Sequence, residues 1–449
     1  MGKLFGTDGV RGVANSELTP ELAYNLGKAG AYVLTKKEQK PVVLIARDTR
    51  ISGDMLENSI TAGILAMGGN VIKAGILPTP AVAYLVRHFK ADAGVVISAS
   101  HNPFEYNGIK FFNGEGFKLD DNIEDEIEDI ILKNIDVNSH ITGDKLGRCL
   151  DTGEDAMSIY ANYLKSTVDI DLKGLKLVID CANGAAYKVA EKVFSELGAK
   201  VIAIHNDPNG ININEICGST HPEKLQEMVV SNGADVGLAF DGDADRLIAV
   251  DELGRIVDGD KVMYICAKMM KANGQLPGDL VTATVMSNLG LHNALEKIGC
   301  KLELTQVGDR YVLESMLKTG CAIGGEQSGH IIFLNCSTTG DGILSALQLI
   351  KAVRDSGSKL SLLADEVTIY PQVLKNAKVK NENKVKYMSD PDIVDEIRKL
   401  EEAMAGEGRV LIRPSGTESM VRVMIEGKDI EQITKLAENL ASLLTEKFG

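Results

Sequence analysis

Three aspartates, Asp241, Asp243 and Asp245, crowd into one short stretch of the sequence and alternate with a glycine and an alanine. The apolar residues 236–240 before them predict a buried strand that delivers the carboxylates into a loop. Three anions this close repel one another unless a cation lies among them, and oxygen ligands of this kind suit Mg²⁺. We therefore expect one Mg²⁺ to bind here.

A serine and a histidine follow a second predicted strand. Residues 94–98 are small or β-branched, as in a buried strand, and Asn102-Pro103 prevents its simple continuation. The turn therefore lifts Ser100 and His101 out of the sheet at a strand end, where open α/β sheets bind ligands. A hydroxyl there can attack a phosphoryl group or carry one. The plainer alternative is a turn that only caps the next segment.

Two other interpretations compete for the aspartate loop. An EF-hand would match the aspartates and Glu252 at its twelfth position, but its sixth position requires Gly and is Arg246, and strands are predicted on both sides. A phosphatase with Asp241 as its nucleophile is the second alternative. It leaves Ser100 without a role, so we keep it as the less favoured hypothesis.

Two glycine-rich loops offer sugar and phosphate contacts. Residues 6–12 hold three glycines around Arg11, which this loop can bring close to a ligand, although a tight surface turn is the plainer interpretation. Residues 323–330 carry Glu326 and Ser328, which suit hydroxyl recognition on a sugar. His330 in the same loop is placed for phosphate or proton handling.

A fourth loop, residues 411–418, has the composition of an anion-binding nest. Arg413, the hydroxyls of Ser415 and Thr417, and the backbone amide of Gly416 can close on a phosphate. A polar turn between two strands is the alternative interpretation.

Composition narrows the classes of partner. The net charge of −15 and the absence of Trp disfavour nucleic acid, because binding it takes clustered Lys and Arg and stacking aromatics. No apolar run of about 18 residues predicts a membrane span, and no export leader is apparent. The seven cysteines are scattered without a C-x-x-C motif, as is typical of reduced thiols in a cytoplasm. We therefore expect a cytoplasmic protein with no membrane partner.

Several common motifs are absent from the sequence. It contains no P-loop, no dinucleotide fingerprint and no hydrolase nucleophile elbow. The histidines outside the loops above lack partners at metal-ligand spacing, and we expect structural roles for them: His88, His140, His205, His221 and His292.

The periodicity predicts α/β domains in series. A strand, a helix and a second strand recur over residues 42–71, 175–201 and 280–302, either as a true repeat or because all βαβ units look alike. Past residue 363, short strands mix with two long helices, which is typical of a smaller α+β domain. We expect three mixed-sheet α/β domains followed by one α+β domain. The three α/β domains would carry the serine turn (1–152), the metal loop (153–255) and the sugar loop (256–367), and the α+β domain (368–449) would carry the phosphate loop.

Together these loops resemble those of the α-D-phosphohexomutases, and the resemblance covers essentially the whole chain. It is carried by FGTDGVRG at 5–12, ISASHNPF at 97–104, NGIKFF at 107–112 and GEQSGH at 325–330. The motifs look most like those of members that act on glucosamine phosphate. The resemblance implies four domains around a central cleft and an isomerase that moves phosphate between the 6- and 1-hydroxyls of glucosamine, in the synthesis of the UDP-linked amino sugar. A member acting on glucose or mannose phosphate is the alternative.

Residue roles follow from the resemblance. Ser100 would become phosphorylated and pass its phosphate to the sugar monophosphate, which forms a bisphosphorylated intermediate, and the three aspartates would hold Mg²⁺ against the phosphate on Ser100. Glu326 and Ser328 would bind the sugar 3- and 4-hydroxyls. The 411–418 loop would hold the phosphate that is not in transfer, through Arg413, Ser415, Gly416 and Thr417. Positive charge and proton transfer would come from a set in which acid and base stay unassigned: Arg11, His101, Lys110, Arg246 and His330.

The resemblance also suggests a homodimer. A sugar-phosphate sensor without catalytic activity is disfavoured, because a sensor needs no metal loop beside a serine.

Overall fold

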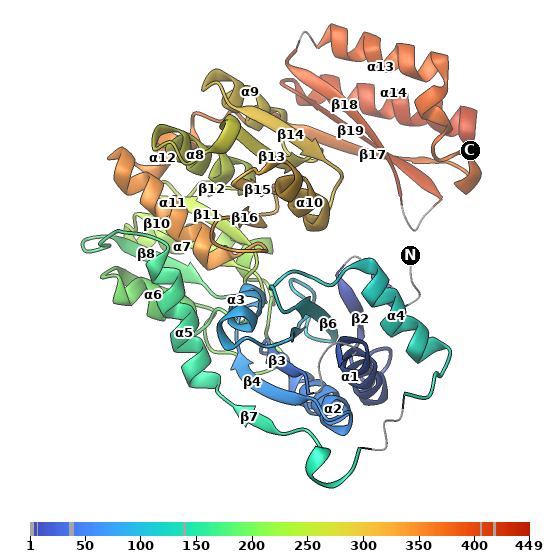
Figure 1. Ribbon diagram of the computed structural model, residues 1–449. Coiled ribbons are helices and arrows are strands. Elements are labelled where there is room, and N and C mark those ends of the chain that lie inside the picture. The colour runs from blue at the N-terminus through green and yellow to red at the C-terminus, as the bar shows by residue number, and fades with distance from the viewer. Residues whose placement is uncertain (1–3, 7, 36–39, 138–140, 405, 416–418) are drawn as a thin grey trace. The chain divides into compact units, whose positions relative to one another are not determined.

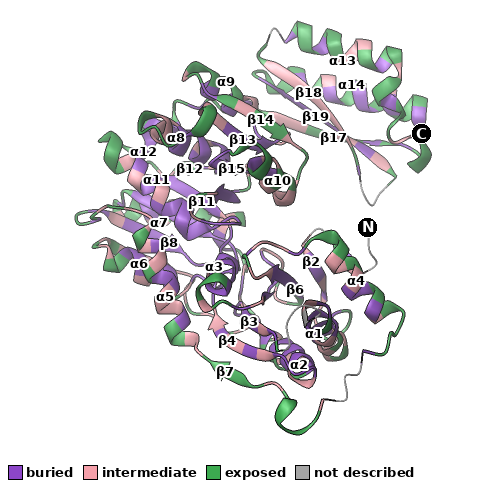
Figure 2. Cartoon of the chain, in the orientation of Figure 1, coloured by how far each residue is buried: buried purple, intermediate pink, exposed green. Residues whose placement is uncertain are grey.

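The computed structural model describes residues 4–6, 8–35, 40–137, 141–404, 406–415 and 419–449. The chain divides into two compact units, Met1–Met286 with Cys300–Asp365, and Ser287–Gly299 with Glu366–Gly449. Each unit is considered by itself below, with elements labelled as in Figure 1. In each unit buried residues gather on the central strands of the sheets and on the inner helix faces (Figure 2).

The first sheet of the larger unit is mixed and has the order β1-β2-β6-β5-β3-β4-β7. β3 pairs in parallel with β4 and β5, whereas β6 runs antiparallel to both β5 and β2. Its strands are β1 (Phe5–Gly6), β2 (Gly9–Val13), β3 (Val42–Arg47), β4 (Asn70–Ile76), β5 (Ala93–Ile97), β6 (Tyr106–Asn113) and β7 (Cys149–Asp151). Its helices are α1 (Pro20–Thr35), α2 (Gly53–Ala66), α3 (Thr79–Phe89) and α4 (Asp121–Leu132), with a 3-10 turn η1 (Gly143–Lys145).

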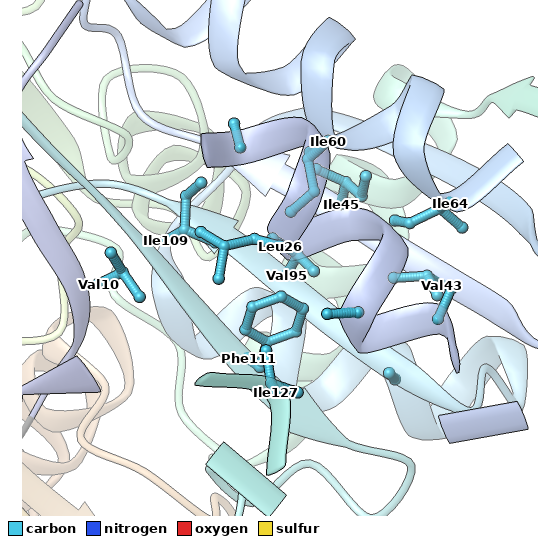
Figure 3. Close-up of a cluster of buried hydrophobic side chains, with 14 of the residues drawn as sticks. Val10, Leu26, Val43, Ile45, Ile60, Ile64, Val95, Ile109, Phe111 and Ile127 are labelled. Carbon is cyan, nitrogen blue, oxygen red and sulfur yellow. The ribbon is translucent and has the colours of Figure 1, made fainter. Parts of the chain in front are cut away.

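Helices cover both faces of this sheet, which explains why all five residues of β5 are buried. On one face, Leu26 of α1, Ile60 of α2 and Ile127 of α4 pack with strand residues such as Val95 into one apolar core (Figure 3). On the other face α3 approaches closely, because Gly94 has no side chain: a Cβ there would lie 2.6 Å from Val82 and Val86. The core therefore fixes the strand end from which the Ser100 turn departs.

The second sheet has the order β12-β11-β10-β8-β9, with β8 parallel to β9 and β10, and β10 antiparallel to β11. Its elements are α5 (Gly153–Ser166), β8 (Lys176–Asp180), α6 (Val189–Glu196), β9 (Lys200–Ile204), η2 (Gly218–Thr220), α7 (Glu223–Asn232), β10 (Val236–Phe240), β11 (Leu247–Asp251) and β12 (Ile256–Val257). The loop between β10 and β11 carries the three aspartates.

The third sheet has the order β14-β13-β15-β16. Its elements are α8 (Gly259–Ala272), η3 (Pro277–Asp279), β13 (Leu280–Thr284), β14 (Lys301–Thr305), α10 (Asp309–Thr319), β15 (Ile323–Gly325), β16 (Ile331–Phe333), α11 (Gly342–Ser356) and α12 (Leu360–Ala364). The loop between β15 and β16 holds Glu326, Ser328 and His330.

The smaller unit is built on an antiparallel sheet in the order β17-β19-β18. Its elements are α9 (Leu289–Lys297), β17 (Gln372–Lys378), η4 (Asn381–Asn383), η5 (Lys386–Ser389), α13 (Pro391–Ala403), β18 (Gly408–Pro414), β19 (Met420–Gly427) and α14 (Ile430–Phe448). Ile393 of α13, Ile425 of β19 and Leu440 of α14 share one core.

The expected fold class is confirmed: three mixed α/β sheets follow one another, and an α+β unit ends the chain. Each predicted βαβ stretch contains a parallel strand pair. In the second of these stretches the sequence predicts a helix over residues 185–197, and the observed helix α6 is shorter and begins at Val189. The residues before it form turns that place Gly184 against the metal loop, where a Cβ would lie 2.4 Å from the carbonyl oxygen of Gly242. The proposed domain boundaries stay predictions.

Candidate active site

The serine after β5 and the first aspartate after β10 are in direct contact. Ser100 Oγ donates a hydrogen bond to Asp241 Oδ2 at 2.6 Å, and only 2% of the Ser100 surface is exposed. The Ser100 backbone has a φ of +52°, in the left-handed region that non-glycine residues seldom adopt. The ends of strands from two different sheets therefore meet at this hydroxyl.

The three aspartates form a compact and buried cluster. One oxygen from each of Asp241, Asp243 and Asp245 lies within 4.8 Å of the other two. Oδ1 of Asp243 and Oδ1 of Asp245 are buried without a hydrogen-bond partner among the described residues. Buried carboxylate oxygens that lack hydrogen bonds and converge in this way fit a hard divalent cation such as Mg²⁺.

The cluster has an uneven charge distribution. Burial, with Asp245 and Asp243 next in importance, raises the pKa of Asp241 well above its ordinary value. Burial alone would also raise the pKa of Asp243, but the Lys110 ammonium and the Thr79 hydroxyl outweigh it and hold that pKa low. Asp243 therefore stays ionised more easily than Asp241.

An ion-pair network with two lysines extends from Asp243 of this cluster. Nζ of Lys110, which is 2% exposed, lies 3.1 Å from Asp243 Oδ2 and 3.2 Å from Asp8 Oδ2. Nζ of Lys118 lies 2.8 Å from Asp8 Oδ1 and 2.7 Å from Asp309 Oδ2. Arg11 also pairs with Asp8. Burial alone would raise the pKa of Asp309, but Lys118 outweighs it and holds that pKa at about 2.

The two histidines differ in environment. His101 Nδ1 lies 3.3 Å from Ser100 Oγ, and burial followed by the charges of Arg246 and Arg11 lowers its pKa. His330 is 3% exposed, and its Nδ1 lies 3.3 Å from Asp245 Oδ2. Burial opposes protonation of His330, but Asp245 and Asp309 raise its pKa to about 9. The Gly340 amide donates to His330 Nε2 at 3.1 Å, so a second proton on this ring would displace that hydrogen bond.

A cavity of about 760 Å³ opens beside the cluster. Its lining includes Arg11 from the first sheet, Asp245 and Arg246 from the loop after β10, and Glu326 and His330 from the loop after β15. The volume falls in the range of small-ligand sites. Ser100 is not among the lining residues, so access to its hydroxyl requires side chains around it to move.

Most of the residues proposed from the sequence come together here: Ser100, His101, Arg11, Lys110, Asp241, Asp243, Asp245, Arg246, Glu326 and His330. Ser328 lies in the same loop as His330 but is exposed and does not line the cavity. Arg413 and Ser415 belong to the smaller unit, where Arg413 lies near the end of strand β18 and is paired in register with Arg422 of β19. Burial and the Arg422 charge lower the pKa of Arg413. Gly416, Thr417 and His140 lie outside the described residues.

Several groups at or near this site could hardly be predicted from the sequence. Asp8 stands in the first glycine-rich motif, which was its only signal. Lys118 and Asp309 are brought together by the fold across 191 positions. Asp180, His205 and Cys217 also converge, with His205 Nδ1 2.9 Å from Asp180 Oδ2, although their spacing in the sequence matches no metal motif.

Nothing in the described chain is suited to spanning a bilayer: each helix there is too short or too polar to cross one.

Comparison with known proteins covers all four parts of the chain. Residues 2–137, 158–254 and 258–370 match the alpha/beta/alpha domains I, II and III of phosphoglucomutase/phosphomannomutase, and residues 374–443 match its C-terminal domain. Proteins named phosphoglucosamine mutase from Clostridium acetobutylicum and Caldicellulosiruptor bescii are 58% and 59% identical over 447 and 451 residues, with complete coverage of both chains.

Solved structures share the fold at low identity. A phosphoglucomutase/phosphomannomutase family protein from Burkholderia thailandensis superposes with a TM-score of 0.82 at 23% identity, covering 100% of this chain and 99% of that one. An N-acetylphosphoglucosamine mutase from Aspergillus fumigatus, solved with GlcNAc-6P and magnesium, has a TM-score of 0.69 at 18% identity and coverages of 100% and 96%. The chain carries the four domains of this family in series and is an isomerase. It belongs to the phosphoglucomutase/phosphomannomutase family of phosphohexomutases.

Proposed function

We propose that this enzyme interconverts glucosamine 6-phosphate and glucosamine 1-phosphate, through a phosphoserine at Ser100 and a bisphosphorylated sugar intermediate. The observation that carries the proposal is the 2.6 Å contact between the Ser100 hydroxyl and Asp241. It is supported by full-length relatives that are more than half identical and are named phosphoglucosamine mutase. A reaction of this type fits the synthesis of UDP-linked amino sugars in a bacterial cytoplasm.

The buried aspartates would hold one Mg²⁺ through one oxygen each of Asp241, Asp243 and Asp245. When bound, this ion supplies charge neutralisation at the phosphoryl group in transfer. The Oδ1 atoms of Asp243 and Asp245, which have no hydrogen-bond partner among the described residues, leave ligand positions for it. Lys110 fixes Asp243 in its ionised form, because its ammonium lies 3.1 Å from that carboxylate.

Positive side chains must balance the remaining charge. A phosphoserine adds about −1.5 to −2 charges to those of the aspartates, which one divalent ion cannot neutralise. Arg11 and Arg246 line the cavity, and a buried Nε of each has no hydrogen-bond partner among the described residues. We assign these guanidinium groups to the phosphate in transfer.

Sugar recognition and proton transfer use the remaining residues. Glu326 lines the cavity and is assigned, with Ser328, to the sugar 3- and 4-hydroxyls. His101 and His330 are the candidates for proton transfer, since the first lies 3.3 Å from Ser100 Oγ and the second lines the cavity. In the smaller unit, the loop with Arg413, Ser415, Gly416 and Thr417 is assigned to a phosphate group of the substrate. We also propose a homodimer.

The substrate assignment is tested by the kcat/KM values of the enzyme with the 1-phosphates of glucosamine, glucose and mannose in coupled assays. We expect glucosamine 1-phosphate to give the highest value. A higher value with glucose or mannose 1-phosphate would instead assign the enzyme to another specificity within the family.

The chemistry of the phosphoenzyme is tested separately. A phosphoserine resists hydroxylamine, whereas an acyl phosphate on Asp241 is cleaved by it. Loss of phosphate from the phosphorylated enzyme on hydroxylamine treatment would therefore contradict the phosphoserine mechanism and favour a phosphatase with Asp241 as its nucleophile.

A further inference from the structure

Two side chains outside the site described above, Arg50 and Asn214, donate hydrogen bonds to the turn that carries Ser100. Arg50 Nη2 donates to the carbonyl oxygens of Ser100 at 3.2 Å and Asn102 at 2.5 Å. Asn214 Nδ2 donates to the same two oxygens at 2.9 and 3.0 Å. The two carbonyl groups therefore accept four hydrogen bonds. Two come from Arg50, which follows strand β3 of the first sheet, and two come from Asn214, which follows strand β9 of the second sheet.

Arg50 is itself fixed by buried partners. Its side chain is fully buried, and its guanidinium pairs with Asp48, which is 1% exposed. Asp48 Oδ2 also accepts a hydrogen bond from Ser98 Oγ at 2.5 Å, and Ser98 Oγ accepts one from the Ser100 amide at 3.0 Å. Asp48, Arg50 and Ser98 thus hold both the amide and the carbonyl of Ser100.

Asn214 reaches the turn from the loop that follows β9. Its backbone lies in the left-handed region, with φ of +59°, and its amide donates to the carbonyl oxygen of Ala182 at 2.9 Å. Asn214 must turn its side-chain nitrogen toward the two carbonyl oxygens, because its side-chain oxygen would repel both. Gly242, between the first two aspartates, packs on the same group: a Cβ at Gly242 would lie 2.6 Å from the Ser100 carbonyl oxygen and 2.8 Å from Asn214 Nδ2.

We infer that Asn214 and Arg50 are positioning residues that set the Ser100 hydroxyl in register with the aspartate cluster. Ser100 has a left-handed backbone, and such a conformation persists only where surrounding contacts over-determine it. Asn214 stands in the loop after β9, a strand of the sheet that also delivers the aspartates, so its hydrogen bonds connect the Ser100 turn to the same sheet as the metal loop. The expected effect on kcat rests on the proposed function, whereas the expected position of the Ser100 hydroxyl does not.

The test replaces Asn214 with Asp, which has the same shape and tolerates the left-handed backbone but presents two oxygens to the carbonyl groups. We expect kcat for glucosamine phosphate isomerisation to fall by about tenfold to a hundredfold with little change in KM, as for a small misplacement of a reacting group. Asn212→Asp is the matched control, because it lies in the same loop and its amide donates to the Asp207 carbonyl oxygen at 3.1 Å, away from the turn.

A second variant, Arg50→Lys, keeps the charge beside Asp48 but loses the fork that reaches both carbonyl oxygens. We expect the same loss of kcat. Far-ultraviolet circular dichroism identifies any variant that fails to fold. Crystal structures of wild type and the folded variants then give the distance between Ser100 Oγ and Asp241 Oδ2, which we expect to lengthen from 2.6 Å.

The outcomes are distinguishable. An Asn214→Asp or Arg50→Lys enzyme with wild-type kcat and an unmoved Ser100 turn would overturn the inference while leaving the proposed function intact. A wild type that isomerises none of the sugar phosphates would refute the proposed function, and the crystallographic distance would still decide whether these residues position the turn.

Discussion

Gly242→Ala adds a single methyl group at the point where the aspartate loop meets the Ser100 turn. The new Cβ would lie 2.6 Å from the Ser100 carbonyl oxygen, 2.8 Å from Asn214 Nδ2 and 2.9 Å from Ile213 Cδ1. An ordinary contact begins at 3.4 Å, so the carbonyl oxygen would have to retreat by about 0.8 Å. Gly242 is not among the positive-φ glycines, so any effect arises from this crowding.

Displacement by this amount should affect catalysis more than folding. A misplacement of about 1 Å at a reacting group can lower a rate by about a hundredfold, whereas overpacking a core with one methylene typically costs about 1–3 kcal/mol. We therefore expect kcat of the Gly242→Ala enzyme to fall by one to two orders of magnitude, by this estimate, while the protein remains folded.

The assay compares kcat and KM with the urea midpoint of unfolding for Gly242→Ala and for Gly153→Ala. Gly153 is the matched control because its Cβ would meet nothing nearer than 3.6 Å. A Gly242→Ala enzyme with wild-type kcat would refute the claim that the Ser100 turn is held against the metal loop. An equal loss in the Gly153→Ala enzyme would show that the effect is not local.

Further predictions concern charge, metal and the nucleophile. Lys110→Met removes the cation beside Asp243 and should lower the free energy of unfolding by about 3 kcal/mol, and Mg²⁺ should restore more stability to this variant than to wild type. Asp309, with its pKa held at about 2 against an ordinary 3.8, stabilises the fold fully above pH 3.8 and loses this contribution as the pH falls toward 2. Lys118→Met should therefore remove roughly 1–2 kcal/mol of acid-sensitive stability in pH-dependent denaturation. Chelation of Mg²⁺ should abolish turnover and lower the free energy of unfolding by about 2.7 kcal/mol relative to a hundredfold excess of metal over its Kd. Ser100→Ala should abolish isomerisation yet still bind sugar phosphate in calorimetry, and wild-type turnover by this variant would contradict the phosphoserine mechanism.

The parts of the site that follow strand ends could be predicted from the sequence. The apolar runs before Ser100 and Asp241 identify buried strands, and parallel sheets place polar residues at their carboxyl ends. Strand periodicity also predicted the three mixed sheets, because β-branched runs between glycine turns are a local signal.

The supporting network could not be predicted in the same way. Its residues have roles that depend on contacts with partners far along the chain, as for Arg50, Asn214 and the Lys118–Asp309 pair. In the sequence alone, single charged or amide residues look like ordinary surface residues. The late start of α6 has the same origin, since Gly184 must approach Gly242 and this contact overrides helix propensity. Residues 185–188 are therefore predicted to be helical, although the fold uses them as turns.

The central claim is that one cation joins the serine to the aspartate cluster. The most direct measurement is a crystal structure of the phosphorylated enzyme with Mg²⁺. We expect phosphate on Ser100 Oγ and a cation bound at about 2.0–2.1 Å by one oxygen each of Asp241, Asp243 and Asp245 and by a phosphate oxygen. Phosphate found on Asp241, or a cation bound away from these three carboxylates, would contradict the account.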